Sequence, residues 1–265
     1  MSSERPFSHG WNPASSLEER GVGKTHLIRS CEAHWQPLLW FDLLDYELYR
    51  TLISDPSLFV RQVEGFSRFP DIAAQYHGKI PNMSRIARAA GISEKRVAAY
   101  FQILEDTLMC WRLPGWSESP TKLLRISLKL YLFDNVVANA LKGELALIPR
   151  KGTSRYGDLF EAWIVQEAFR AIDYKNLELK LSYWQTNTDQ EVDLIVSRGL
   201  GEPLLAVEIK SETAPRFTDV RGLKSFAADY PATKLQCWCQ TRTRYLDNGV
   251  EFLPWREGLA GLKTI

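Results

Sequence analysis

Charged residues interrupt two apolar stretches in the last third of the chain, and this limits the possible folds more than any other feature. The segment "EVDLIVSRGLGEPLLAVEIK" predicts two strands joined by a turn. Residues two apart in a strand point to the same face, so Glu208 and Lys210 share a face. Asp193 comes beside Glu208 if the strands pair antiparallel. Because burying charge is costly without a partner or a metal, the segment predicts a site.

The elements around this segment predict an α/β domain over residues 145–265. A helix "GDLFEAWIVQEAF" and a strand "LKLSYWQT" precede it, and a helix "DVRGLKSFAADY" and the strands "KLQCWCQ" and "VEFLPW" follow. This order is typical of PD-(D/E)XK, or restriction-endonuclease-like, domains. Glu161 lies beside the apolar stripe of the first helix and could reach the sheet. The alternative is that the acids and the lysine lie on a rim facing solvent.

The grouped carboxylates favour a divalent cation. Two carboxylates held close raise each other's pKa unless a cation neutralises them, and Mg²⁺ prefers oxygen ligands. We expect Asp193 and Glu208 to bind Mg²⁺, Glu161 to help hold it, and Lys210 to orient a water or neutralise developing charge. The enzymatic hypothesis is a metal-dependent phosphodiesterase that acts on DNA.

A second pattern, over residues 67–144, predicts a winged-helix domain. "MSRIARAAGISEKRVAAYFQIL" has helical apolar spacing on both sides of Gly91, with Ser84 and Ser93 as N-caps. The strands "MCWRL" and "KLYLFD" would form the wing, with Lys122 and Arg125 in its loop. A role in protein contacts or domain docking is the alternative to DNA binding. The predicted phosphate contacts are Arg85, Arg88, Lys95 and Arg96.

Residues 1–66 contain a partial phosphate-binding motif. "GVGKTHLI" matches the end of a Walker A motif, in which Gly21 and Gly23 would let the backbone wrap the phosphates of ATP. Lys24 and Thr25 would reach phosphate and Mg²⁺. However, Glu18 stands at the first glycine position, and no apolar strand precedes the loop. We interpret this region as a remnant of a P-loop domain without ATP hydrolysis; a chance match is the alternative.

Taken in order, these segments resemble the prokaryotic AAA-type ATP-binding proteins that carry a C-terminal domain of unknown function. The resemblance implies a restriction-endonuclease-like C-terminal domain with motif positions at Glu161, Asp193, Glu208 and Lys210. One departure is large: after "DPSLFV" the chain passes almost directly to "RFPDIAAQYHG". The chain therefore resembles an internally deleted member. The likeness is carried by "GVGKTHLIRS", "LLWFDLLDYELYRTLISDPSLFV", "GISEKRVAAYFQILEDTLMCWRLPGW", "KLYLFDNVVANAL", "YGDLFEAWIVQEAF", "QEVDLIV" and "AVEIK".

Composition bounds the remaining possibilities. The net charge of +1 means that any surface for DNA must be a local patch. The four cysteines have no zinc-binding spacing, and no apolar run is long enough to span a membrane, so we expect a cytoplasmic protein. Three hypotheses follow: a nuclease, a non-catalytic DNA-binding or regulatory protein, and a P-loop ATPase switch. An exposed P-loop remnant could also associate with another chain, such as a second copy in a homo-oligomer.

Overall fold

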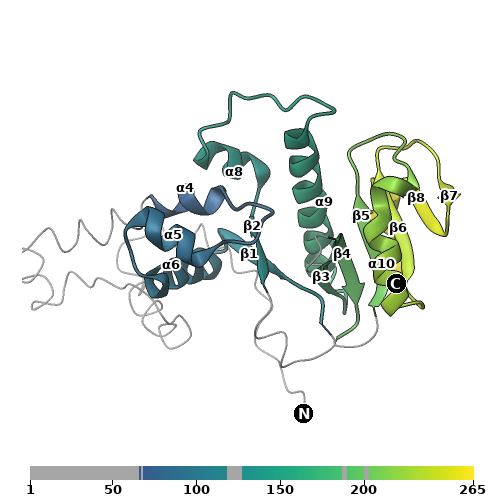
Figure 1. The fold of residues 1–265 in the computed structure, drawn as a ribbon, viewed down its shortest axis with the longest axis horizontal. Helices are drawn as coiled ribbons and strands as arrows, with labels where there is room; N and C mark the ends of the chain where they lie inside the picture. The colour runs from purple at the N-terminus through teal and green to yellow at the C-terminus, as the bar shows by residue number, and fades with distance from the viewer. Residues whose placement is uncertain (1–65, 67, 118–126, 187–189, 200–202) are drawn as a thin grey trace, which may run out of the picture. The chain divides into compact units, whose positions relative to one another are not determined.

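The computed structural model describes residue 66 and residues 68–117, 127–186, 190–199 and 203–265 (Figure 1). The chain divides into two compact units, Met1–Tyr49 and Arg50–Ile265, and every described residue lies in the second. This part is mixed α/β, as predicted. Several predicted site residues lie outside the described residues: Gly21, Gly23, Lys24, Thr25, Lys122 and Arg125.

Three helices form the first part of the unit: α4 (Phe69–Ala74), α5 (Met83–Ala90) and α6 (Glu94–Asp106). Gly91 ends α5 in the left-handed conformation, with φ 65°, which glycine adopts without steric cost. The Ser93 hydroxyl accepts a hydrogen bond from Arg96 N and caps α6, as predicted. The apolar residues of both helices pack with Phe69 in one cluster.

The cap predicted for α5 is wrong. Asn82, not Ser84, is the N-cap, and its side chain accepts from Arg85 N. The helix begins earlier than a Ser84 cap would require, so Ser84 lies in the first turn. Its hydroxyl instead donates to Glu94 Oε1 at 2.7 Å, which links the two helices.

An antiparallel hairpin of β1 (Cys110–Pro114) and β2 (Leu128–Leu132) follows the helices. Its two faces pack in different cores. Leu130 and Leu132 join the helical cluster, whereas Leu113 and Tyr131 join the core of the large sheet. Trp116 N, just past β1, donates to Tyr183 O at 2.5 Å on the edge strand of that sheet. The hairpin thus joins the helical part to the sheet.

A short helix, α8 (Asn135–Leu141), follows β2 and was not predicted. The Asp134 side chain caps it by accepting from Val136 N. The long helix α9 (Ser154–Tyr174) then begins at Ser154, before Gly157, where the predicted helix starts. Thr153 caps α9, and this cap residue explains the earlier start.

Six strands form the large sheet, in the order β3-β4-β5-β6-β8-β7. Neighbours β3, β4 and β5 are antiparallel, β5, β6 and β8 are parallel, and β7 is antiparallel to β8. The sequence did not predict β7 or the last helix. The strands are β3 (Lys180–Gln185), β4 (Glu191–Ser197), β5 (Pro203–Ile209), β6 (Lys234–Cys239), β7 (Tyr245–Asp247) and β8 (Val250–Pro254).

Helices cover both faces of this sheet (Figure 1). On one face, α9 and α11 (Trp255–Gly261) pack on residues such as Leu194, Val207 and Trp238. On the other, α10 (Arg221–Asp229) packs Leu223 and Phe226 onto the sheet. Short 3₁₀ turns at Phe217–Val220 and Leu262–Thr264 flank these helices. In the described part of the chain, no helix has the length and apolar character needed to cross a bilayer.

Candidate functional site

Asp193 and Glu208 lie at the same end of the sheet. Because β4 and β5 are antiparallel, the start of β4 lies beside the end of β5. Leu194 pairs with Val207, and one step outward on each strand brings Asp193 opposite Glu208. Each residue is only 7% exposed, and Ile209 N donates to Asp193 Oδ2 at 2.7 Å. The backbone pairing therefore sets the two buried residues at neighbouring positions of adjacent strands.

A bulge in β4 lies between Val192 and Ile195, the stretch that contains Asp193. Between the pairs Ser182–Ile195 and Trp184–Val192, β4 takes three steps while β3 takes two. A bulge re-aims side chains and is frequent next to active sites. Simple alternation therefore does not fix the direction of Asp193, and the hydrogen bond from Ile209 N holds its carboxylate instead.

Glu208 is only partly satisfied by its surroundings. Lys210 Nζ donates to Glu208 Oε1 at 2.8 Å, as expected for residues two apart on one face. The other carboxylate oxygen, Oε2, is buried and has no hydrogen-bond partner among the described residues. A buried oxygen without a donor is costly, so this atom marks a position where a bound cation would be stabilising.

A residue that the sequence did not predict, Lys129, belongs to the same group of charges as Asp193, Glu208 and Lys210. Lys129 on β2 is 6% exposed, and its ammonium lies 3.5 Å from Glu161 Oε1 on α9. The same ammonium forms an ion pair with Glu191 at the start of β4. The available signal was a lysine inside the apolar run "KLYL", alternating with residues that face the helices. Glu161 is thus connected to the other acids by its ion pair with Lys129 of the hairpin.

The pKa values reflect crowding of buried charge. Burial and the Asp193 charge raise the pKa of Glu208 well above its usual range. Burial also raises the pKa of Asp193, against the opposing effect of Lys210, and raises that of Glu161 to about 8. Burial alone would lower the pKa of Lys129, but Glu161 and the other nearby acids more than offset it. The carboxyl groups therefore hold protons more tightly, and Lys129 stays charged.

The charges of the cluster match one divalent cation. With all groups ionised, the four acids and two lysines leave two uncompensated negative charges. In the described ranges, no group of three or more His, Cys, Asp or Glu side chains is arranged to hold a metal. Mg²⁺ often uses one or two carboxylates and several waters, so Asp193 and Glu208 fit it in that mode. The cluster consists of Asp193, Glu208, Glu161, Glu191, Lys129 and Lys210.

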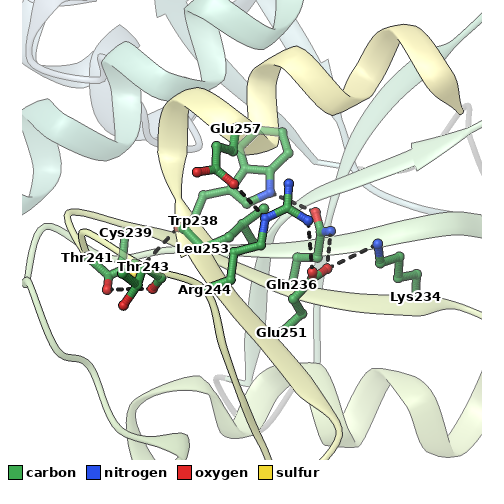
Figure 2. Close-up of polar contacts among 10 residues, drawn as sticks. All are labelled: Lys234, Gln236, Trp238, Cys239, Thr241, Thr243, Arg244, Glu251, Leu253 and Glu257. Atoms are coloured by element: carbon green, nitrogen blue, oxygen red, sulfur yellow. Dashed lines mark hydrogen bonds and ion pairs between the residues drawn. The ribbon is translucent and has the colours of Figure 1, made fainter.

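A nearby polar network shows the contrast with a fully satisfied carboxylate. Glu251 on β8 accepts from Gln236 Nε2 at 2.7 Å and pairs with Lys234 at 3.0 Å (Figure 2). Arg244 bridges Glu251 and Glu257. Burial would raise the pKa of Glu251, but the bonds from Gln236 and Lys234 lower it. Both carboxylate oxygens of Glu251 therefore have partners.

The predicted DNA contacts lie on α5 and α6, away from these acids in sequence. Arg85 and Arg88 on α5 and Lys95 and Arg96 on α6 are all exposed. Because all four basic side chains are exposed, they are accessible to phosphates. No described residue of the acid cluster contributes to this surface.

Two family models match the chain. One, a Domain of unknown function (DUF4143), matches residues 156–257 and contains Glu161, Asp193, Glu208 and Lys210. The domain is found in AAA-associated proteins, which agrees at that level with the predicted resemblance. The other, a Domain of unknown function (DUF8612), matches residues 48–147, which include α4 to α6, the hairpin and α8. No curated protein and no solved structure matches the chain.

Proposed function

We propose that the region from α9 to the C-terminus is a PD-(D/E)XK nuclease-like domain that hydrolyses DNA phosphodiesters with a divalent metal ion. The observation that carries the proposal is the pairing of β4 with β5, which sets buried Asp193 opposite buried Glu208. The Lys210 ammonium lies directly on Glu208. Two acids on neighbouring strands and a lysine directly after one of them are the groups that such a reaction needs.

Each side chain has a separate task in this proposal. Asp193 and Glu208 would hold the ion, which when bound lowers the pKa of water and stabilises charge on a phosphoryl oxygen. Glu161 would help hold the ion, and because a nearby cation favours the ionised carboxylate, metal binding would lower its pKa from about 8. Lys210, with its ammonium at this position, would orient the attacking water or stabilise developing negative charge.

The helical part would deliver DNA to this site. The exposed basic residues of α5 and α6 are suited to phosphate contacts, which position a protein on DNA without reading its sequence. A winged-helix role for α5, α6 and the hairpin is part of the same proposal. Because the net charge is only +1, binding should depend on this local patch.

A second function is favoured by one observation: Lys129 and Lys210 already pair with three of the four carboxylates. A cluster neutralised in this way would suit a DNA-binding or regulatory protein that keeps the nuclease-like fold without catalysis. Such a protein would bind DNA and leave it intact.

Cleavage assays separate the two functions. Plasmid and single-stranded DNA are incubated with Mg²⁺ or Mn²⁺ and wild type, Asp193→Ala, or Glu251→Gln as a matched control from the satisfied network. We expect metal-dependent cleavage by wild type and the control, and a loss of about 100-fold or more in Asp193→Ala. Equal cleavage by all three, or DNA binding with no cleavage by wild type, contradicts the catalytic proposal.

A further inference from the structure

Lys129 occupies an unusual position for a lysine. It is the second residue of strand β2, between Leu128 and Leu130, and is 6% exposed. Alternation in β2 turns Leu130 toward the helical cluster and Tyr131 toward the core of the large sheet. The lysine stem leaves the hairpin near Tyr183, whose ring lies 5.2 Å from Nζ. A charge buried at this depth requires nearby carboxylates.

The carboxylates that pair with Lys129 belong to the other family-matched segment. Lys129 lies within the segment 48–147, whereas Glu161 and Glu191 lie within the segment 156–257. The ammonium contacts Glu161 Oε1 at 3.5 Å and also pairs with Glu191, two residues before Asp193. The hairpin therefore inserts a fixed positive charge into the acid cluster.

The hairpin holds this charge in place by packing. Trp111 on β1 stacks on Tyr131 at 4.9 Å and on Phe169 of α9 at 4.2 Å between ring centroids. Leu113 is fully buried in the same core. These contacts do not involve the ammonium, so removing the charge of Lys129 should leave the position of the hairpin unchanged.

We propose that Lys129 is an internal cation that competes with a divalent metal ion for the acid cluster and thereby sets the metal affinity of the site. The inference rests on the proposed metal-dependent function. Its physical basis is that an ammonium and a divalent ion near the same carboxylates repel each other and share the same negative charge. A lysine from the hairpin thus makes metal binding depend on how the helical part packs on the sheet.

Calorimetric titration of Mn²⁺ into the full chain tests this competition without measuring activity. The variant Lys129→Met keeps the length and apolar stem of the side chain and removes its charge. The matched control is Lys234→Met, which removes a lysine of the large sheet that pairs with Glu251 at 3.0 Å (Figure 2). Asp193→Asn reports whether the observed Mn²⁺ binds at the predicted site.

We expect Lys129→Met to bind Mn²⁺ at least tenfold more tightly than wild type, with Lys234→Met unchanged. If wild type and Lys129→Met bind Mn²⁺ equally tightly and Asp193→Asn does not bind it, the proposed competition between Lys129 and the metal is overturned. The proposed metal site is then retained. No Mn²⁺ binding by any of the proteins overturns the metal site as well. If Lys129→Met does not fold, the double variant Lys129→Met, Glu191→Gln is compared with Glu191→Gln alone. We again expect at least tenfold tighter Mn²⁺ binding when Lys129 is replaced, and equal Mn²⁺ affinity would again contradict the competition.

Discussion

Lys129 Nζ lies 3.5 Å from Glu161 Oε1, and this contact joins a strand of the hairpin to the long helix α9. The side chain of Lys129 is 7% exposed, and that of Glu161 is 29% exposed. Each group would be costly to bury alone, because a partly buried charge needs a partner. The pair therefore contributes both to the charge of the site and to the stability of the chain.

Thermal unfolding of wild type, Lys129→Met, Glu161→Gln and the double variant tests whether this pair stabilises the chain. Lys129→Met and Glu161→Gln should each destabilise the chain, because each leaves a buried charge without its partner. The double variant should be more stable than the sum of the two effects predicts, by about 1–2 kcal/mol of coupling energy. Additive effects within about 0.5 kcal/mol would show that the pair is not coupled.

A glycine beside the site should not tolerate a side chain. A Cβ atom on Gly222, in the first turn of α10, would lie 1.9 Å from the backbone oxygen of Glu191. Gly222→Ala must push α10 away from the start of β4, and we expect a decrease of about 3 kcal/mol or more in the free energy of unfolding. Gly261→Ala is the control, because no atom lies within 4 Å of its added Cβ. If Gly222→Ala and Gly261→Ala have similar free energies of unfolding in urea, the close approach of Gly222 to the backbone of Glu191 is contradicted.

His77 should make stability depend on pH. Its Nδ1 accepts from Leu132 N at 3.0 Å, and its Nε2 bonds Asn135 Oδ1 at 2.8 Å, so the ring is neutral. Burial lowers its pKa from 6.5 to about 4. The unfolded chain thus binds a proton that the folded chain does not as pH falls from about 6.5 to about 4. The titration of His77 alone should lower the free energy of unfolding by about 2–3 kcal/mol over this range.

The matched variant for this prediction is His77→Gln, which cannot titrate in that range. The acids that titrate in both proteins cancel when the two unfolding curves are compared at each pH. The difference in the free energy of unfolding between wild type and His77→Gln should narrow steadily from about pH 7 to about pH 4. Parallel curves over the whole range would mean that the buried ring does not titrate as described.

Salt dependence of DNA binding tests the patch on α5 and α6. Arg88→Ala with Lys95→Ala should weaken binding to any DNA sequence and lower the slope of log affinity against log salt by about 1 for each phosphate that is no longer neutralised. Lys263→Ala, an exposed lysine near the C-terminus, should leave the slope unchanged. A slope equal to wild type in the double variant would move the DNA surface elsewhere.

Local patterns in the sequence predicted much of the fold. Gly91 and Ser93 mark the turn and the start of α6, and the spacing of Glu208 and Lys210 determines their shared face. The bulge in the stretch of β4 that contains Asp193 and the pairing of Lys129 with Glu161 and Glu191 could not be predicted. Both arise from contacts between segments far apart in the chain, which no local spacing encodes.

Short elements were missed for a related reason. Strand β7 has three residues and pairs only with β8 among the described strands, so its alternation is too brief to separate from a loop. Helix α8 has seven residues and one fully buried side chain, Ala138, so it carries little apolar periodicity. Their positions depend on the tertiary structure around them.

Anomalous X-ray diffraction from crystals of the full chain soaked in Mn²⁺ tests most directly whether the acid cluster binds a divalent ion. We expect a peak within about 2–2.5 Å of carboxylate oxygens of both Asp193 and Glu208, a distance typical of hard cations with oxygen ligands. The Glu251 network, whose carboxylate is already paired, should show none. A peak that touches neither Asp193 nor Glu208, or crystals that show no peak at all, would contradict the proposed metal site.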